Sequence, residues 1–310
     1  MPELRAPVRP ILKWAGGKRQ LLPELRPFYP RVFLRYVEPF LGSGAVFLDL
    51  YNAGLLDGRR VALSDINADI IGCYLMVRDR PAAVVSALRA LEGRHRRRGE
   101  AHFYEVRDKA FNPARRAVHA ATDPAASYTP ALAAMLIYLN RTGFNGLFRV
   151  NGRGDFNVPA GRYARPLICD DANLFAWSEA LNRAGVTIGV AAFEAALEHV
   201  GQDDFVYLDP PYAPVSGTAR FTAYTAGGFG ASRQEALQRM VIRLASRGAS
   251  VLLSNSAAPQ IKALYARDRH ARTAGLKATT VSARRAINSR AASRGAVQEY
   301  LITNVARRSV

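Results

Sequence analysis

Short hydrophobic runs alternate with helical patterns along most of the chain. Seven of these runs have the length and composition of β-strands. They span Leu34–Pro39, Arg60–Ile66, Val186–Phe193, Phe205–Leu208, Ser250–Ser254, Ala278–Ser282 and Glu299–Thr303. Helical patterns cover Ala45–Asn52, Asp69–Met76 and Ser232–Arg247, and for the last of these the sequence predicts Ser232 as the N-cap and Gly248 as the stop. This alternation predicts an α/β fold.

The pattern changes between residues 68 and 169. Helical segments that include the basic run Arg94–Arg98 lead into a segment rich in Gly, Asn and aromatic residues, Leu139–Asn151, which continues to Pro159. Its glycines and asparagines predict a hairpin or loop outside the sheet. We therefore expect residues 68–169 to form an insert in an α/β domain made of residues 1–67 and 170–310. The run Arg94–Arg98 by itself is more typical of a solvated helix face than of a specific contact.

The chain carries a large excess of positive charge, with 43 Lys and Arg against 25 Asp and Glu and a net charge of +18. Such a charge favours a polyanionic partner, and nucleic acid is the first candidate. Only five of the basic residues are lysine. A codon bias toward arginine is an alternative explanation for that choice, but it does not explain the excess over acidic residues.

Several protein classes are disfavoured. No hydrophobic run approaches the roughly 20 residues of a membrane-spanning helix, and the first residues lack the apolar stretch of a secretory signal. The two cysteines, Cys73 and Cys169, lie far apart, and the five histidines do not have the spacing of metal ligands. We expect a cytoplasmic protein without a metal or a disulfide framework.

The tetrapeptide Asp209-Pro210-Pro211-Tyr212 follows the hydrophobic run Phe205–Leu208. Because Pro210 cannot continue a strand, the motif is predicted at the carboxyl end of a buried strand, where α/β sheets bind ligands. An Asp-Pro turn with an exposed tyrosine is the alternative interpretation.

These residue types suit methylation of an exocyclic amino group. The amino lone pair of adenine is delocalised into the ring, so hydrogen-bond acceptors on both amino hydrogens would help the nitrogen to become tetrahedral. The Asp209 carboxylate and the Pro210 carbonyl are two such acceptors, and both favour the positive charge that develops on nitrogen. Tyr212 would stack on the base, which must leave the duplex for its amino group to be reached.

A second motif, Glu38-Pro39-Phe40-Leu41-Gly42-Ser43-Gly44, also follows a predicted strand and precedes a helix. Its glycines permit close approach of the backbone to a ligand. About 20 residues later Asp65 ends the next strand, where an acidic residue can bind ribose hydroxyls. The pair predicts a nucleoside cofactor and does not choose between NAD and S-adenosylmethionine, although the missing third glycine disfavours a pyrophosphate.

A third motif is Lys13-Trp14-Ala15-Gly16-Gly17-Lys18, which precedes a predicted helical segment, Arg19–Leu25. Amide groups at a helix N-terminus suit a carboxylate, and Lys18 adds a positive charge. The spacing of a Walker A loop is absent, which excludes a P-loop nucleotidase.

Together these motifs resemble the Dam-type DNA adenine methyltransferases of class alpha, also called D12. The similarity covers nearly the whole chain, and the block Asn140–Tyr163 is its most specific part. Further matching segments are Lys13–Lys18, Val37–Gly44, Ser64–Asn67, Phe205–Pro214, Leu253–Ser256, Arg284–Ser289 and Val297–Asn304.

The resemblance implies a Rossmann-like methyltransferase sheet with an inserted, mostly helical target-recognition domain. It implies transfer of the methyl group of S-adenosylmethionine to N6 of a flipped adenine in duplex DNA, and we expect the target sequence to be GATC. It also implies a monomeric protein of prokaryotic or phage type, with a restriction endonuclease as a possible partner.

The resemblance assigns roles to individual residues. The catalytic residues are then Asp209, Pro210, Pro211 and Tyr212. The residues implied to bind the cofactor are Trp14, Ala15, Gly16, Gly17, Lys18, Glu38, Pro39, Phe40, Gly42, Gly44, Asp65, Phe193 and Asp209. Those implied to bind DNA are Arg141, Phe144, Asn145, Leu147, Arg149, Asn157 and Pro159. Arg149 matches a residue that contacts a guanine, and Phe144 matches an intercalating aromatic.

The chain departs from the family pattern at two positions. Many relatives have Tyr where Phe144 stands, so the ring is kept and a hydroxyl is lost. Relatives usually carry a polar residue before the aromatic at Phe193, and Ala192 cannot supply its hydrogen bond to the cofactor. By spacing alone, Phe144 and Phe148 could equally pack in the core of the insert.

Three other functions remain open at this point. The same loop could methylate cytosine N4 or RNA. Two features favour adenine: position 209 is an aspartate, where a serine would favour cytosine, and the block Asn140–Tyr163 is present. A non-enzymatic DNA-binding protein should have lost Asp209, Asp65 or Lys18, and the chain keeps all of them. A dehydrogenase is the weakest alternative.

Overall fold

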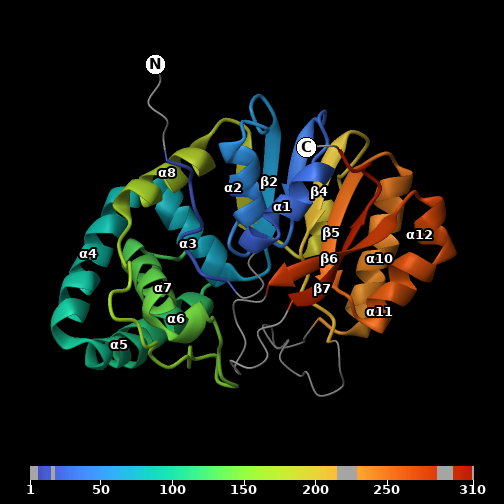
Figure 1. The fold of residues 1–310 in the computed structure, drawn as a ribbon. Helices are drawn as coiled ribbons and strands as arrows, with labels where there is room; N and C mark the ends of the chain where they lie inside the picture. The colour runs from blue at the N-terminus through green and yellow to red at the C-terminus, as the bar shows by residue number, and fades with distance from the viewer. Residues whose placement is uncertain (1–5, 15–17, 215–228, 285–295, 309–310) are drawn as a thin grey trace. The chain divides into compact units, whose positions relative to one another are not determined.

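The chain divides into two compact units. The computed structural model describes residues 6–14, 18–214, 229–284 and 296–308 (Figure 1). Unit 1 comprises Met1–Gly17, Gly42–Leu55 and Asp65–Val190, and unit 2 comprises Lys18–Leu41, Leu56–Ser64 and Ala191–Val310. The predicted insert, residues 68–169, lies within unit 1. Its assignment as a separate target-recognition domain stays a prediction.

Every strand predicted from the sequence is present. The strands are β1 (Arg35–Glu38), β2 (Arg60–Asp65), β3 (Val186–Val190), β4 (Asp204–Leu208), β5 (Ser250–Ser256), β6 (Lys277–Arg284) and β7 (Ala296–Thr303). The six strands other than β3 follow the order β2-β1-β4-β5-β7-β6. The pairs from β2 to β5 are parallel, and β7 is antiparallel to both β5 and β6. The expected α/β fold is therefore confirmed.

The core of unit 2 lies where the central strands meet α10 (Ala231–Ser246). Val206 of β4 and Leu253 of β5 are fully buried and belong to the same cluster as Leu237 and Val241 of the helix. α10 packs against β5 (Figure 1). At about 25 cal/mol per Å² of buried apolar surface, this contact is the main force that holds helix and sheet together.

One detail of α10 differs from the prediction. The N-cap is Gly230, without a side-chain hydrogen bond, so the prediction of Ser232 as the cap is wrong. The chain enters the helix earlier, because the amides of Arg233 and Gln234 already bond to the Gly230 carbonyl. The predicted stop is confirmed, since Gly248 follows the helix with a φ of 88°.

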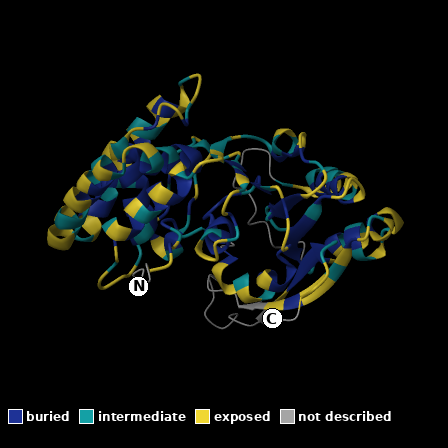
Figure 2. Ribbon diagram, turned by 90° about the horizontal axis from the view of Figure 1, so that it is seen from above, coloured by how far each residue is buried: buried dark blue, intermediate teal, exposed yellow. Residues whose placement is uncertain are grey.

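Unit 1 is mostly helical. Its helices are α2 (Ala45–Asn52), α3 (Ala68–Asp79), α4 (Pro81–Arg98), α5 (Glu100–Glu105), α6 (Asn112–His119), α7 (Pro130–Thr142) and α8 (Asp171–Asn182), with a π-helical turn η3 (Val106–Phe111) and a 3-10 turn η4 (Phe144–Gly146). Asn67 and Thr129 cap α3 and α7 through their side chains, as the residue types favour. α2 and α3 are buried along most of their length, whereas the other helices of unit 1 carry both buried and exposed residues (Figure 2).

The remaining short elements belong to unit 2. They are η1 (Lys18–Gln20), α1 (Leu22–Leu25), η2 (Arg26–Phe28), α9 (Phe193–Leu197), α11 (Pro259–Ile261), η5 (Lys262–Arg267) and α12 (Arg269–Thr273). The predicted helical segment Arg19–Leu25 is thus a 3-10 turn followed by a four-residue helix that begins beside Pro23. None of the described helices is both long and apolar enough to cross a membrane.

Candidate active site

Asp209 lies directly after β4, whose five residues are all buried. Its Oδ1 atom lies 2.7 Å from Nζ of Lys18 and accepts a hydrogen bond of 3.0 Å from the Ser254 hydroxyl. Burial raises the pKa of Asp209, while Lys18 and Ser254 act in the opposite direction. Lys18 is itself buried, so this is an ion pair with little access to water.

Tyr212 is held by a second carboxylate. Its hydroxyl donates a hydrogen bond of 2.8 Å to Oε2 of Glu299, a buried residue of β7. Nζ of Lys18 lies 4.5 Å from the centre of the Tyr212 ring, within the range of a cation–π contact. Burial, followed by the nearby Asp209 and Glu299 carboxylates, raises the pKa of Tyr212 well above its usual value, which keeps the hydroxyl a donor.

Polar side chains behind the Asp209–Tyr212 loop fix its backbone. The side chain of Gln234 in α10 donates a hydrogen bond of 2.9 Å to the Pro211 carbonyl and accepts one of 3.1 Å from the side-chain amide of Asn255. Oδ1 of Asn255 in turn accepts a hydrogen bond of 3.3 Å from the backbone amide of Ala213. The Pro210 carbonyl, in contrast, accepts no hydrogen bond from any residue that the structure describes. Pro210 is itself a buried residue, and Asp209 beside it is partly exposed.

Two further cofactor candidates of unit 2 lie beyond the end of β1 and at α9. The Phe40 and Phe193 rings stack with centroids 5.6 Å apart. Ala192 is the N-cap of α9 and provides no side-chain hydrogen bond. The polar group that relatives usually carry at this position is therefore not replaced there. Glu38 is buried at the end of β1 and accepts 2.8 Å from the Tyr36 hydroxyl, and Pro39 follows it.

In unit 1, hydrogen bonds join Asp65, the last residue of β2, to Gly42 of the glycine loop. Its Oδ2 accepts from the Gly42 amide and its Oδ1 from the Asn67 amide, each at 2.9 Å. Burial raises the pKa of Asp65 to about 6 against these hydrogen bonds. Gly42 has a φ of 47°, and a Cβ there would lie 3.0 Å from the Trp14 ring, so a larger residue would strain the loop.

The structure thus brings Trp14, Gly42 and Asp65 together, with Gly44 at the N-terminus of α2 in the left-handed conformation, φ 66°. Three predicted cofactor residues, Ala15, Gly16 and Gly17, lie outside the described residues. The matching segment Arg284–Ser289 lies largely outside them as well.

The segment from Asn140 to Pro159, which is predicted to read the DNA sequence and is called the reading hairpin below, forms the expected hairpin. Its antiparallel bridges are Gly143–Ala160 and Val150–Phe156. Exposed Arg149 donates to Oδ1 of Asn157 at 2.8 Å, so one predicted DNA contact positions another. Phe148 is buried and stacks on Trp14 with ring centroids 5.5 Å apart, whereas Phe144 is 43% exposed.

The other residues that are predicted to bind DNA differ in how far they are exposed. Asn145 adopts a left-handed φ of 54° and Leu147 is half-buried, while Pro159 is exposed and accepts 2.9 Å from the Phe144 amide. Arg141 donates to the carbonyls of Ile11 and Pro10 at 2.9 and 3.2 Å. These bonds anchor the N-terminal segment, and a DNA contact by Arg141 stays a prediction.

The chain's similarity to known proteins identifies this arrangement. A family model described as D12 class N6 adenine-specific DNA methyltransferase matches residues 14–287. The chain belongs to this family. Membership makes it an adenine-specific DNA methyltransferase, which implies S-adenosylmethionine as the methyl donor and DNA as the substrate. No group of three metal-binding side chains occurs among the residues that the structure describes.

Relatives of this methyltransferase align over nearly its full length. It is 34% identical over 297 residues to the type II methyltransferase M1.LlaDCHI of Lactococcus lactis subsp. cremoris, covering 96% of this chain and 95% of the relative. It is 35% identical over 295 residues to the DNA adenine methylase of Escherichia coli K12, covering 94% of each. A solved rRNA methyltransferase, AviRa of Streptomyces viridochromogenes, aligns over 98% and 93% of the two chains at 14% identity, with a TM-score of only 0.35.

Several residues of the methyltransferase site were missed by sequence reasoning. Ser254, Asn255, Gln234 and Glu299 surround the Asp209–Tyr212 loop, yet none was assigned a role. A signal existed for the first two, because Ser254-Asn255-Ser256 is a polar triplet at the carboxyl end of a buried parallel strand. For Glu299, only the strand order that places β7 beside β5 reveals the contact.

Proposed function

We propose that this methyltransferase modifies N6 of an adenine that is flipped out of a GATC site in duplex DNA. The observation that carries the proposal is the pair of acceptors at the end of β4, the partly exposed Asp209 carboxylate and the Pro210 carbonyl, which accepts no hydrogen bond from a described residue. Two acceptors on one amino group are what a weakly nucleophilic adenine nitrogen requires.

In this proposal Asp209 and Pro210 accept the two amino hydrogens and stabilise the positive charge that develops on N6. Lys18 and Ser254 orient the Asp209 carboxylate from the side away from the base. Tyr212, fixed by Glu299, supplies a rigid ring for stacking. S-adenosylmethionine, when bound, supplies the electrophilic methyl group.

Within each unit taken by itself, some residues suit one part of a nucleoside cofactor. In unit 1 the left-handed Gly42 packs closely against the Trp14 ring, and Asp65 keeps lone pairs for ribose hydroxyls beyond those that backbone amides occupy. In unit 2 the buried Glu38 and the Phe40–Phe193 pair suit an amine and an adenine ring. The family requirement for this cofactor supports these assignments.

The catalytic proposal is tested by Asp209→Ala. Removing one preorganised acceptor typically costs about 10²–10³ in rate. We expect methyl transfer to fall at least that far while duplex binding, measured by fluorescence anisotropy, is retained. Near-normal turnover of the variant would contradict the role of Asp209.

Target recognition is assigned to the segment Asn140–Pro159. Arg149 can contact O6 and N7 of a guanine at the outer base pair, a pairing worth about 1–3 kcal/mol. Asn157 holds its guanidinium, while the exposed Phe144 would stack where the adenine leaves and Asn145 would fill that space. The test compares methylation of GATC duplexes with single-base variants by wild type and Arg149→Ala. We expect the variant to lose discrimination at the outer pair only, and equal wild-type rates on all duplexes would contradict GATC specificity.

A further inference from the structure

The second strand of the reading hairpin, residues 154–158, is hydrogen-bonded along both of its edges. In an extended strand, the backbone groups of successive residues point to opposite edges. The Asn157 amide donates a hydrogen bond of 3.1 Å to the Arg149 carbonyl, so Asn157 faces the first strand of the hairpin. Its neighbours Phe156 and Val158 must then face the other edge, where a third strand would pair in a sheet.

Side chains from η3 and α6 take the place of that third strand. Oδ1 of Asn112 accepts a hydrogen bond of 2.8 Å from the Phe156 amide, and its Nδ2 donates one of 3.1 Å to the Phe156 carbonyl. Nη1 of Arg107 donates a hydrogen bond of 3.0 Å to the Val158 carbonyl. These are the bonds that a neighbouring strand would make to the same backbone groups.

A third donor continues the series. Arg115, one turn further along α6, donates to the carbonyl of Gly154, two residues before Phe156. The carbonyls of residues 154, 156 and 158, which alternate along the strand, are therefore each bound by a side chain of this one segment. The donors follow the spacing of the strand.

A π-helical turn places these donors on one face. The backbone N–H of Asn112 bonds to the Arg107 carbonyl five residues earlier, at the end of the turn Val106–Phe111. In a regular α-helix two residues five apart point roughly 140° away from each other, whereas the π-helical bond stacks one over the other. Arg115 follows Asn112 by three residues, a spacing that shares a face of an α-helix. The π-helical turn thus has a use, which is to align Arg107 with the two donors of α6.

The centre of this contact is buried. Asn112 is 6% exposed and Phe156 is 1% exposed, and the Phe111 ring packs edge-on against the Phe156 ring with centroids 5.8 Å apart. Backbone groups that are buried need hydrogen-bond partners. Because Asn112 bonds to both backbone groups of a single residue, it fixes the register of the strand as well as its distance from α6.

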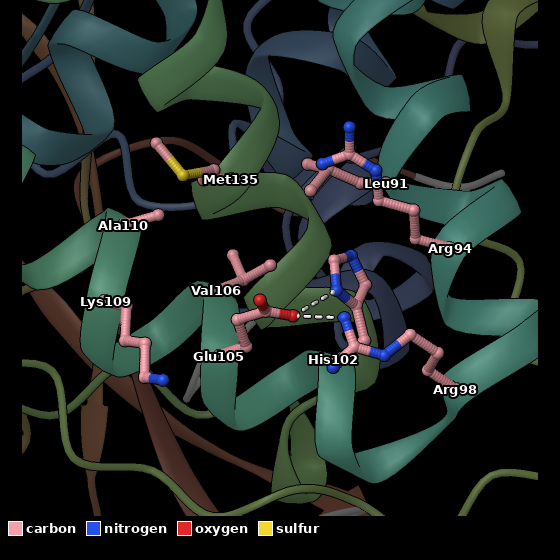
Figure 3. Close-up of a pocket in the computed structure, with 9 residues that line it drawn as sticks. All are labelled: Leu91, Arg94, Arg98, His102, Glu105, Val106, Lys109, Ala110 and Met135. Atoms are coloured by element: carbon pink, nitrogen blue, oxygen red, sulfur yellow. Dashed lines mark hydrogen bonds and ion pairs between the residues drawn. The ribbon is translucent and has the colours of Figure 1, made fainter.

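Other residues of η3 have a different environment. Val106, Lys109 and Ala110 line a pocket among α4, α5 and α7 (Figure 3). Arg107 and Asn112 are not among its lining residues. The hydrogen bonds that hold the hairpin can therefore be removed without changing a residue of that pocket.

We propose that Asn112, together with Arg107, is a positioning residue for target recognition. The two residues hold the strand that carries Asn157, and Oδ1 of Asn157 accepts a hydrogen bond of 2.8 Å from Arg149. A bidentate contact to a guanine depends on the placement of the guanidinium, so a displaced strand would misplace the reading group. This inference rests on the proposed role of Arg149 at the outer base pair. Neither Asn112 nor Arg107 itself contacts DNA in the proposal.

The test measures discrimination, defined as kcat/KM for a GATC duplex divided by kcat/KM for a duplex altered at its outer base pair. Asn112→Leu removes both bonds to Phe156. Asn173→Leu is its matched control, because Asn173 is 7% exposed and holds both backbone groups of Arg9, at 2.9 and 2.8 Å, outside the hairpin. We expect Asn112→Leu to lose about tenfold in discrimination, out of the roughly 5- to 150-fold that one good bidentate pair provides, and the control to lose less than about twofold.

A second pair of variants keeps the test decisive if Asn112→Leu does not fold. Arg107→Met removes the bond to Val158 from a side chain that is partly exposed. Arg78→Met is its control, since both arginines also form the same two hydrogen bonds to the aspartate that follows them. We expect Arg107→Met to lose discrimination, by less than Asn112→Leu, and Arg78→Met to retain it.

The contrary outcomes are distinct. Discrimination that is retained by Arg107→Met or by a folded Asn112→Leu, or that is lost equally in a control, would overturn the inference and leave the role of Arg149 intact. If the proposed function itself were wrong, wild type and Arg149→Ala would treat all duplexes alike. The inference would then fall with it.

Discussion

In the proposed mechanism Glu299 acts on the reaction mainly through Tyr212, whose hydroxyl donates to it at 2.8 Å, although its charge also raises the pKa of Asp209. We expect Glu299→Gln, which keeps an acceptor, to stay within a few-fold of wild-type turnover. Glu299→Leu should lower kcat by about 10- to 100-fold, since small misplacements of a positioning group have effects of that size. Combining it with Tyr212→Phe should cost little more than either change alone. Additive losses in single-turnover kinetics would show that Glu299 acts by another route.

The proposed role of Asp65 in cofactor binding predicts that this binding depends on pH. In the proposed contact its ionised form would accept hydrogen bonds from ribose hydroxyls, and its pKa is raised to about 6 by burial. Protonation removes this acceptor capacity, so affinity for S-adenosylmethionine should be highest above pH 7 and fall as the pH drops through 6. Calorimetric titrations from pH 5 to 8 test this expectation, with Asp65→Asn as a weaker and pH-independent control. An affinity unchanged over that range would contradict the ribose contact.

At the residue scale, sequence reasoning could locate those groups whose position follows from a single strand. Asp209 was predicted directly after a strand and Asp65 at the end of one, and the structure has both there. Glu299 could not be found in this way, because its contact with Tyr212 joins residues 87 positions apart and depends on the order of β4, β5 and β7.

At the scale of elements, β1 and β4 were predictable because buried parallel strands are continuous hydrophobic runs. The cap of α10 was not, since the choice between Gly230 and Ser232 depends on the path of the preceding chain. The π-helical turn Val106–Phe111 has no simple sequence signature either, and it lies within a pattern that resembles an ordinary helix.

A buried ion pair connects α3, α6 and the reading hairpin. Asp69 is 1% exposed and bonds to Arg115 at 2.7 Å, with His119 and Tyr128 each at 3.0 Å, while Arg115 also donates to the Gly154 carbonyl. Removing one partner of such a pair costs about 3–5 kcal/mol, because the other charge stays buried.

We therefore expect Asp69→Ala to lower the free energy of unfolding by about that amount in denaturant titrations. Asp69→Leu with Arg115→Leu should recover much of the loss. Burial raises the pKa of Asp69, but His119 and Arg115 lower it below its usual value overall. The carboxylate thus stabilises the fold at neutral pH, and this contribution should disappear as the pH falls below about 4. A loss below 1 kcal/mol for Asp69→Ala would contradict the network.

At the scale of the whole molecule, the net charge of +18 predicts a steep dependence of duplex binding on salt. Each phosphate contact adds about −0.9 to the slope of log affinity against log salt concentration. We expect a slope that corresponds to several contacts in anisotropy titrations between 50 and 200 mM salt, roughly the range over which such contacts weaken. A slope near zero would show that the arginine excess reflects codon usage.

We propose that the acceptors at Asp209 and Pro210 accept the amino hydrogens on N6 of the adenine in GATC. Long-read sequencing of DNA from a methylation-free host that expresses the chain reports the modified base and its sequence context together. We expect N6-methyladenine at GATC sites in DNA from cells that express the wild-type protein and none in DNA from cells that express Asp209→Ala. Methylated cytosine N4, or N6-methyladenine that persists in the variant, would contradict it.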